Sequence, residues 1–458
     1  MVRTSHALLV GLITVFLTAL IAFVGGWLAS QTFGNVPFQY VTSTITGQPT
    51  TETAPADVAD TFTVFWDVWE LVDREFYRTD PLDNQQMTYG AIRGMLQSLN
   101  DDYTIFQEPE AAERSRESLE GKFEGIGIYM RIENGEVVVD RPIRGSPAIN
   151  AGLQSGDIIV MVQGQPVSEL IDGLGDPEAM QAVARVVRGP KGSSVDLTIR
   201  RPADGTTFDV AIVRDEVPLI SVNYQMLEDG VAYVQLTEFK ATTTGELDAA
   251  LRELLPQQPR SMVLDLRNNP GGYLTTAQEV LGRFYDGVAL YEELNDGTDK
   301  EFSTIRGPRD VRVPDLPLVV LVNNSSASAA EIVAGALRDK RPHTTLLGET
   351  SFGKGSVQNI HQLRDGSSVR ITIAQWLTPN RQVIHNVGIT PDHIVLASQE
   401  EAYLVPCIDD GVSPTRTEPC YDAQLSWGLR LLLTGAIPPQ PEPTPTGYIR
   451  QNPVSMVQ

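Results

Sequence analysis

The stretch Leu316–Arg338, LPLVVLVNNSSASAAEIVAGALR, decides the fold of this 458-residue chain. Its first part, Leu316–Val322, is a continuous apolar run, a pattern typical of a strand that is covered on both faces. Small residues then lead into a segment from about Ser328 to Arg338, which predicts a helix. A buried strand that runs directly into a helix predicts an α/β domain.

The same alternation continues upstream of this stretch. Strands are predicted at Gly230–Leu236 and Met262–Leu266, and helices at Leu247–Leu255 and Leu274–Phe284. We therefore expect an α/β core over residues 204–400. Residues 119–203 contain short strands with many glycines and predict a small β domain. Within that domain, Val195–Arg200 alternates like an edge strand.

The remaining segments differ in composition from these two domains. Residues 61–118 contain two amphipathic patterns, Phe65–Tyr77 and Met87–Leu99, which predict an N-terminal helical region. Residues 31–60 are rich in Thr, Ala and Pro and predict a linker. After a C-terminal region at 401–436, residues 437–458 form a proline-rich tail that we expect to be disordered.

The N-terminus predicts a membrane anchor within residues 1–30. The segment Ala7–Val24 carries no charge, and about 20 apolar residues suffice to cross a bilayer. Arg3 precedes it and no charge follows before Glu52, which places the N-terminus in the cytoplasm and the bulk of the chain outside. A cleaved signal peptide is the alternative, although Trp27-Leu28-Ala29 is a poor cleavage site. We expect a single-pass protein of the cell membrane.

The net charge, the cysteines and the absence of a metal motif limit which ligands and cross-links we expect. A net charge of −23 argues against nucleic acid, whose phosphates need a basic surface. The two cysteines, Cys407 and Cys420, are close enough in sequence to close a short loop by a disulfide in an oxidising compartment, although geometry decides whether they bond. The chain has no His-Glu-x-x-His helix, and we expect neither a metal nor a cofactor.

Two glycine-containing segments carry groups that could take part in catalysis. Asp265–Gly272, DLRNNPGG, runs from a strand into a turn whose backbone N–H groups can form an oxyanion hole; an ordinary turn is the alternative. Thr350–Gln358, TSFGKGSVQ, places Lys354 between two glycines. Burial that lowers its pKa from about 10.4 towards 7 makes a lysine a general base, whereas a solvated lysine has no such role. In an extended stretch, Lys354 and Gln358 share one face.

A third segment, Asn323–Glu331, brings small residues to the start of a helix. A serine there has an accessible hydroxyl and lies at the positive end of the helix dipole. Chemistry does not distinguish Ser325, Ser326 and Ser328, and Ser328 with Glu331 also matches a capping box. No histidine lies in a Ser–His–Asp triad motif, and no Gly-x-Ser-x-Gly elbow surrounds Ser328.

The β domain carries an ordered series of motifs. Its first strand begins with Phe123, Glu124, Gly125, Ile126, Gly127 and Ile128. The motif SPAINAGLQSGDII at 146–159 and the turn RGPKG at 188–192 follow. This series resembles the circularly permuted PDZ domain of bacterial proteases. The resemblance implies that the glycine loop offers backbone N–H groups to the carboxylate of a peptide C-terminus, and that the peptide adds as a strand.

Taken together, the motifs resemble those of the carboxy-terminal processing peptidases, also called tail-specific proteases. The matching motifs, within residues 61–397, are YGAIRGML at 89–96, DLRNNPGG at 265–272, SASAAEIVAGALRD at 326–339, TSFGKGSVQ at 350–358 and GITPD at 388–392. The resemblance implies an α/β peptidase core of the ClpP/crotonase type, with an N-terminal helical region and an inserted PDZ domain.

The resemblance also implies roles for individual residues. These are Ser328 as nucleophile, Lys354 as base, Gln358 as the residue that orients the base, the amides of Ala329, Gly271 and Gly272 as oxyanion donors, and Arg188 as a sensor that contacts the peptidase core. The segment Lys340–Thr345 looks one residue longer than the usual spacing of the family. It falls in a loop between a helix and a strand, where an insertion is tolerated.

The expected function is that of a serine endopeptidase that recognises protein C-termini through its PDZ domain and cleaves with a Ser–Lys dyad. Its partners would be protein or peptide C-termini and the membrane. A homo-oligomer is also possible in this interpretation. One alternative is a peptide-binding adaptor with an inactive core. Another is an acyl-transferring or hydrating relative of the crotonases, whose fold shares the glycine turn.

Overall fold

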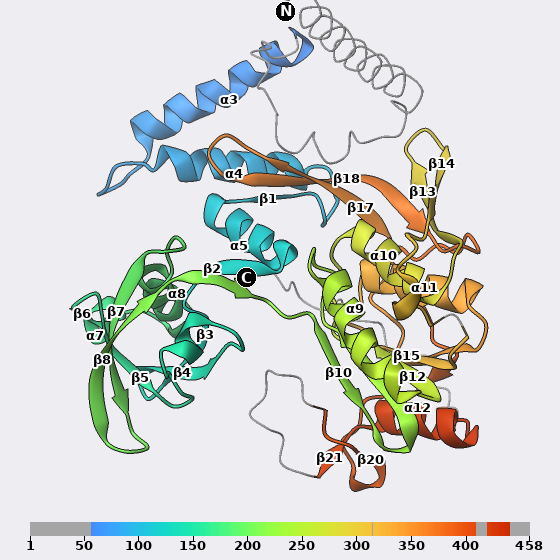
Figure 1. Cartoon of the computed structure of the whole chain (residues 1–458). Coiled ribbons are helices and arrows are strands. Elements are labelled where there is room, and N and C mark those ends of the chain that lie inside the picture. The colour runs from blue at the N-terminus through green and yellow to red at the C-terminus, as the bar shows by residue number, and fades with distance from the viewer. Residues whose placement is uncertain (1–55, 314, 409–418, 440–458) are drawn as a thin grey trace, which may run out of the picture.

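The computed structural model describes residues 56–313, 315–408 and 419–439 (Figure 1). The predicted anchor at 1–30 and nearly all of the predicted linker and tail lie outside these residues. Within them, no helix has both the length and the apolar character needed to span a membrane.

The core is built on a six-stranded sheet in the order β10-β11-β12-β15-β16-β19. Its strands are β10 (Val222–Met226), β11 (Val231–Leu236), β12 (Ser261–Asp265), β15 (Leu318–Val322), β16 (Thr344–Gly348) and β19 (His393–Ile394). The pairing of β10 with β11 is antiparallel and the other pairings are parallel. Parallel neighbours need crossover connections, which helices supply here. The predicted α/β core is therefore confirmed.

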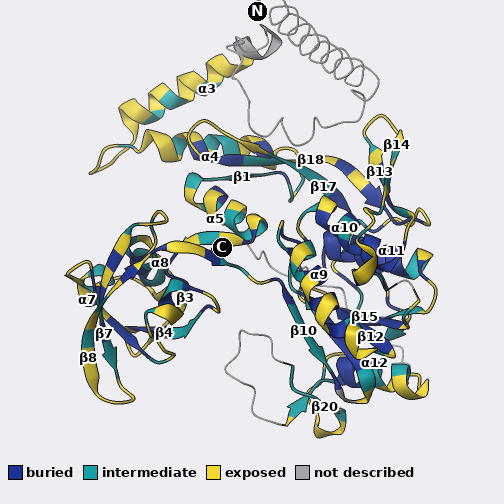
Figure 2. Ribbon diagram, in the orientation of Figure 1, coloured by how far each residue is buried: buried dark blue, intermediate teal, exposed yellow. Residues whose placement is uncertain are grey.

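The central strands are covered on both faces, which explains their continuous apolar sequence. In β15, the side chains of Leu318, Val320 and Val322 join the core under three helices. Val319 and Leu321 point to the other face and pack against the C-terminal helix. The three helices are α9 (Thr243–Leu254), α10 (Leu274–Phe284) and α11 (Ala329–Lys340), and the C-terminal helix is α12 (Ala423–Thr434). These strands appear buried in Figure 2.

A five-stranded antiparallel sheet joins the N-terminal helices to the core. Its strands are β1 (Ile105–Gln107), β13 (Val288–Leu294), β14 (Asp299–Ser303), β17 (Ser356–Gln362) and β18 (Ser368–Leu377). The helices before the β domain are α3 (Ala56–Glu75), α4 (Asn84–Gln97) and α5 (Pro109–Glu120). Helix α3 begins inside the segment predicted as a linker. Because β1 pairs with β18, the N-terminal region forms part of the sheet that carries the lysine segment.

The β domain lies to the left of the core in Figure 1. Its sheet has the order β3-β4-β5-β7-β8, with β6 paired to β5. The strands are β3 (Ile128–Glu133), β4 (Glu136–Pro142), β5 (Ile158–Val162), β6 (Gln165–Pro166), β7 (Ser194–Arg201) and β8 (Thr206–Val213), and the helices are α6 (Pro147–Asn150), α7 (Val167–Leu170) and α8 (Asp176–Val187). The chain enters through β2 (Lys122–Gly125) and leaves through β9 (Asp215–Pro218), which pair with each other. The domain is thus an insertion.

The expectation that Val195–Arg200 is an edge strand is wrong. This segment is β7, which lies between β5 and β8. Its alternating pattern reports one buried face of a sheet, and that pattern carries no information about the number of neighbouring strands. Strand β8 lies beyond residue 203, the end predicted for the domain.

The C-terminal segment packs on the sheet face opposite α9, α10 and α11. A short hairpin of β20 (Leu404–Val405) and β21 (Cys420–Tyr421) precedes α12. Cys407 and Cys420 form a disulfide, with their Cα atoms 5.2 Å apart. The pairing that the sequence allowed is present in the structure.

Candidate active site

Ser328 lies at the junction between the apolar strand β15 and helix α11. Its backbone has φ 54° and ψ −117°, a left-handed conformation that is strained for a residue with a side chain. Strain of this kind persists only where the surroundings enforce it, and it concentrates at functional sites. The turn separates Ser328 from its two neighbouring serines. Ser325 is exposed, whereas Ser326 is buried and donates its hydroxyl to Leu266 O at 2.8 Å.

The Pro-Gly-Gly turn contacts Ser328 directly. A Cβ atom added to Gly271, whose φ is 103°, would lie 2.7 Å from Ser328 Cβ, so only glycine fits there. The Gly271 N–H donates to Asn269 Oδ1 at 2.8 Å and is therefore already used. By contrast, the N–H groups of Gly272 and Ala329 have no acceptor among the described residues. The structure thus leaves two of the three predicted oxyanion donors available.

Glu331 joins the serine segment to the lysine segment. Its Oε2 atom accepts the backbone N–H groups of Ser328 and Lys354, each at 2.9 Å. Its Oε1 atom accepts the Ser351 hydroxyl at 2.5 Å and the Gly353 N–H at 2.7 Å. Burial raises the pKa of this fully buried carboxyl, and its four donors act against that rise. The residue that the sequence marked only as part of a helix cap therefore holds both candidate catalytic segments.

Lys354 lies just before β17 in a half-buried position. Burial is the largest cause that lowers the pKa of Lys354, and the charge of Arg370 adds to it. Asp101 and Glu331 act in the opposite direction. The indole N–H of Trp376 donates to Lys354 O at 3.0 Å and fixes the backbone. A lysine whose pKa is depressed in this way is suited to general-base chemistry.

Gln358 does not contact Lys354 in this structure. Its amide donates to Ser356 Oγ at 2.8 Å and to Thr372 Oγ1 at 3.3 Å. Strand β17 begins only at Ser356, so Lys354 lies before the stretch in which side chains alternate, and the shared face that an extended segment would give does not include it. Among the described residues, the side chains of Ser328 and Lys354 also form no hydrogen bond with each other.

The loop that looked one residue too long lies where the sequence placed it. Helix α11 ends at Lys340 and β16 begins at Thr344, so the extra length falls between helix and strand. The bonds from Glu331 to both catalytic segments are made in the presence of this longer loop.

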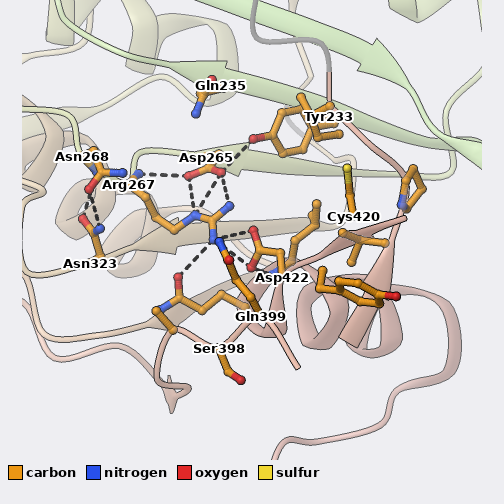
Figure 3. Close-up of a pocket in the computed structure, with 17 residues that line it drawn as sticks. Tyr233, Gln235, Asp265, Arg267, Asn268, Asn323, Ser398, Gln399, Cys420 and Asp422 are labelled. Atoms are coloured by element: carbon orange, nitrogen blue, oxygen red, sulfur yellow. Dashed lines mark hydrogen bonds and ion pairs between the residues drawn. The ribbon is translucent and has the colours of Figure 1, made fainter. Parts of the chain in front are cut away.

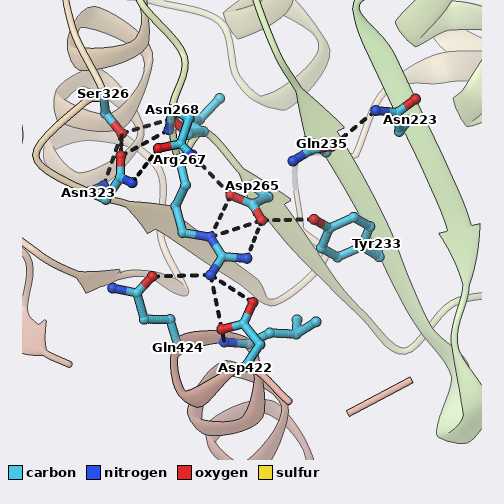
Figure 4. Close-up of polar contacts among 12 residues, drawn as sticks. Asn223, Tyr233, Gln235, Asp265, Arg267, Asn268, Asn323, Ser326, Asp422 and Gln424 are labelled. Carbon is cyan, nitrogen blue, oxygen red and sulfur yellow. Dashed lines mark hydrogen bonds and ion pairs between the residues drawn. The ribbon is translucent and has the colours of Figure 1, made fainter. Parts of the chain in front are cut away.

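An ion network joins the end of β12 to the start of α12 (Figure 4). Asp265 ends β12, and both of its oxygens accept from Arg267. Arg267 also bonds Asp422 at 2.8 Å, and Tyr233 donates its hydroxyl to Asp265 at 2.8 Å. Burial alone would lower the pKa of Arg267. The carboxylates of Asp265 and Asp422 have the larger effect and raise that pKa. The motif DLRNNPGG displays Asp265 and Arg267, but nothing in the sequence predicts Asp422 as their partner.

A cavity of about 270 Å³ lies beside this network, between the sheet and the C-terminal segment (Figure 3). Tyr233, Arg267, Cys420 and Asp422 are among its lining residues. Neither Ser328 nor Lys354 lines it. The cavity is therefore separate from the candidate dyad.

The glycine loop of the β domain leads into an open sheet edge. Among the described strands, β3 pairs with β4 alone, and its other edge lies beside α8. Gly127 has φ 77°, and its carbonyl accepts from Ile143 N at 2.9 Å and Ser146 Oγ at 3.0 Å. Ile126 is buried in the domain core. A loop held in this way, followed by an unpaired strand edge, has the arrangement that strand addition of a peptide needs.

Arg188 lies between the β domain and the N-terminal helices. Its guanidinium bonds Glu117 of α5 at 2.7 Å and lies 4.9 Å from the ring centroid of Phe123. The resemblance implied a contact with the peptidase core, whereas these two partners belong to α5 and β2. Phe123 is one of the residues predicted for the peptide site, so Arg188 lies beside that site.

Two family models match parts of this chain. A family model described as "Peptidase family S41" matches residues 230–395, and one described as "PDZ domain" matches residues 138–201. The carboxy-terminal-processing protease of Bartonella bacilliformis is 37% identical over 354 residues, which are 74% of this chain and 76% of the relative.

The chain is also similar to two further relatives and to one solved structure. The carboxy-terminal processing proteases CtpB and CtpA of Bacillus subtilis are 35% and 36% identical over 70% of this chain, and the chain spans 65% and 66% of their length. A solved photosystem II D1 C-terminal processing protease is 29% identical, with a TM-score of 0.41, over 73% of this chain and 92% of that one. The chain belongs to the family of carboxy-terminal processing proteases, within peptidase family S41, and carries a PDZ domain.

Proposed function

We propose that this chain is a serine endopeptidase that uses Ser328 as nucleophile and Lys354 as general base. The observation that carries the proposal is the shared bond to Glu331, because one oxygen atom accepts the backbone N–H groups of both residues. The strained backbone of Ser328 and the lowered pKa of Lys354 support the same roles.

The proposed reaction is acyl transfer to serine followed by hydrolysis. Neutral Lys354 takes the proton from Ser328 Oγ, which attacks the carbonyl carbon of the scissile peptide bond. The N–H groups of Ala329 and Gly272 stabilise the oxyanion, while Gly271 makes room for the serine. The leaving amine takes a proton from the protonated Lys354, and water then releases the acyl group. Gln358 is proposed to turn from Ser356 towards Lys354 when substrate is bound.

We further propose that the β domain selects substrates by their C-termini. The carboxylate would bind at backbone N–H groups of the turn between β2 and β3, and the peptide would pair with the open edge of β3. Arg188 beside Phe123 would report whether that site is filled. A peptide-binding adaptor would keep this site but would not need a lysine with a lowered pKa.

The location and the assembly of the protein are proposals as well. The uncharged segment Ala7–Val24 supports a single-pass membrane anchor with the peptidase outside the cytoplasm. Exposed apolar side chains on α3, including those of Val64 and Trp66, support a homo-oligomer. Protease accessibility in intact cells tests the first proposal, and sedimentation of the detergent-solubilised chain tests the second.

The function is tested by mass spectrometry of an unfolded substrate protein incubated with purified enzyme. Wild type should cut it, and Ser328→Ala and Lys354→Ala should not, although both should bind its C-terminal peptide like wild type. The neighbouring variant Ser325→Ala is the matched control and should cut normally, because that side chain is exposed and lies outside the strained turn. Peptide binding without cleavage by wild type would identify an adaptor, and full cleavage by Ser328→Ala would refute the dyad.

A further inference from the structure

The immediate neighbours of Lys354 cannot shield it. Both of them, Gly353 and Gly355, lack side chains, and both pack tightly against the backbone of residues 385–388. Apolar cover over the ammonium group must therefore come from residues beyond these two glycines. A lysine base needs such cover, because water around the ammonium stabilises the charged form.

The cover comes from Tyr103, in the loop between α4 and β1. The Nζ atom of Lys354 lies 5.2 Å from the centroid of the Tyr103 ring. The ring of His385 packs against Tyr103 edge-on, with centroids 6.0 Å apart and planes at 65°. Tyr103 therefore lies between the lysine and a second ring, in a position that is partly buried.

The loop that carries Tyr103 is fastened to the peptidase sheet. Asp101 accepts the Tyr103 N–H at 3.2 Å and the Thr104 hydroxyl at 2.6 Å. Thr104 Oγ1 in turn accepts the N–H of Thr372 in β18 at 3.0 Å. The side-chain oxygen of Thr372 also accepts the amide of Gln358, so the loop and the predicted orienting residue both bond Thr372. The ring position is thus set by the sheet that carries the site.

We propose that Tyr103 is a positioning residue for the Lys354 base, and that the N-terminal helical region thereby completes the active site. Tyr103 acts through Lys354: its ring excludes water from one side of the amine and holds it near the serine segment. The inference rests on the proposed function, since it concerns the same dyad. It assigns to residues 61–118 a chemical contribution in addition to their place in the fold.

Two effects of the ring oppose each other. The π face attracts an ammonium ion and favours the charged lysine, whereas loss of water disfavours it. The charged groups that face Lys354 are Arg370, Asp101 and Glu331, and burial remains the largest influence on its lowered pKa. Burial is also the first cause that raises the pKa of Tyr103 itself, so the phenol stays neutral. We therefore expect removal of the ring to raise the pKa of the lysine.

The test compares full-length wild type with Tyr103→Phe, Tyr103→Leu and Tyr103→Ala. The pH dependence of kcat/KM is measured on a peptide substrate. Tyr103→Ala should move the acid limb up by about one pH unit, a tenfold loss at any pH below the limb, with recovery at high pH. Tyr103→Phe should keep the wild-type limb. Tyr103→Leu, which retains apolar cover without a π face, should have its limb at or below that of wild type.

A second measurement does not depend on activity. Each variant is placed on a Ser328→Ala background, and Lys354 is labelled competitively with acetic anhydride at several pH values and quantified by mass spectrometry. The pH at which Lys354 is half-labelled should rise in Tyr103→Ala and should not change in Tyr103→Phe. Tyr291→Ala is the matched control, because Tyr291 also lies under a cation, but that cation is Arg381, at 4.1 Å, and not Lys354.

Failure of this inference can be distinguished from failure of the proposed function. An unchanged limb and labelling midpoint in Tyr103→Ala would overturn the inference, as would a shift of equal size in Tyr291→Ala. If Tyr103→Ala does not fold, Tyr103→Gln keeps the bulk, brings a polar amide to the ammonium and should show the same upward shift. Wild type without cleavage activity would refute the proposed function, while the labelling midpoints would still decide whether Tyr103 controls Lys354.

Discussion

Replacing Glu331 with Gln tests whether one carboxylate holds the two catalytic segments. The substitution keeps the shape of the side chain and turns one acceptor oxygen into an NH₂ donor. In the wild type, four donors surround the carboxylate, three of them backbone N–H groups. A glutamine can satisfy at most two positions with its single oxygen atom.

The size of the effect follows from the two orientations of the amide. With its oxygen towards Ser328 and Lys354, the NH₂ group faces the Ser351 hydroxyl, which can accept, and the Gly353 N–H, which cannot. The opposite orientation leaves the N–H groups of Ser328 and Lys354 without an acceptor. Each buried unsatisfied group costs about 1–3 kcal/mol, so the better orientation should lower the free energy of unfolding by roughly that amount.

The substitution should also lower kcat, and by more than the small loss of folding free energy would suggest. Bonds to a neutral amide are about half as strong as bonds to a carboxylate, so the backbone at both catalytic residues is held less firmly. A misplacement of about 1 Å at the reacting groups can reduce the rate on the order of 100-fold. The assay is kcat on an unfolded substrate protein, with thermal unfolding measured on the same samples.

The control is Glu292→Gln, a second buried carboxyl whose pKa is raised by burial. It lies on β13, forms no hydrogen bond with Ser328 or Lys354 among the described residues, and is not among the charges that shift the pKa of Lys354. Removing its charge relieves a burial penalty, so stability should stay the same or rise and kcat should not change. If Glu331→Gln retains wild-type kcat and unfolding temperature, the idea that this carboxylate positions the dyad is refuted.

Three more outcomes are expected. Lys354→Met should abolish cleavage yet raise the unfolding temperature near neutral pH. Because burial lowers the pKa of Lys354, the unfolded state binds the extra proton between the lowered pKa and the ordinary 10.5, so wild-type stability should rise with pH in that window and the variant should lose this slope. Gly271→Ala should reduce kcat/KM about 100-fold, since the new Cβ would lie 2.7 Å from Ser328 Cβ, whereas Gly90→Ala, with nothing within 4 Å, should not. Reducing the disulfide, which spans 13 positions of sequence, should lower the free energy of unfolding by about 3 kcal/mol, measured with and without reductant.

The architecture was readable from local pattern. The strand at Leu318–Val322 and the helix at Leu274–Phe284 lie where their apolar periodicity placed them. Burial on two faces leaves a continuous apolar run, and burial on one side of a helix leaves a 3.6-residue repeat, so both signals survive in the sequence. The strand β8 and the interior place of β7 were not foreseen, because pairing partners leave no trace in a one-sided alternation.

The sequence narrowed the candidate site to short segments whose motifs concentrate small and reactive residues, and the family resemblance named Ser328 and Lys354 among them. Which of the serines sits in a strained turn was decided by the tertiary structure, because φ at Ser328 depends on the packing of Gly271 against it. The structure also adds Glu331 and Tyr103 to the candidate site. Both contact Lys354 from parts of the chain that the local sequence around Lys354 does not indicate. Local residue choice records secondary structure and turn chemistry, whereas the burial of a lysine and the partners of a carboxylate arise only when distant segments pack together.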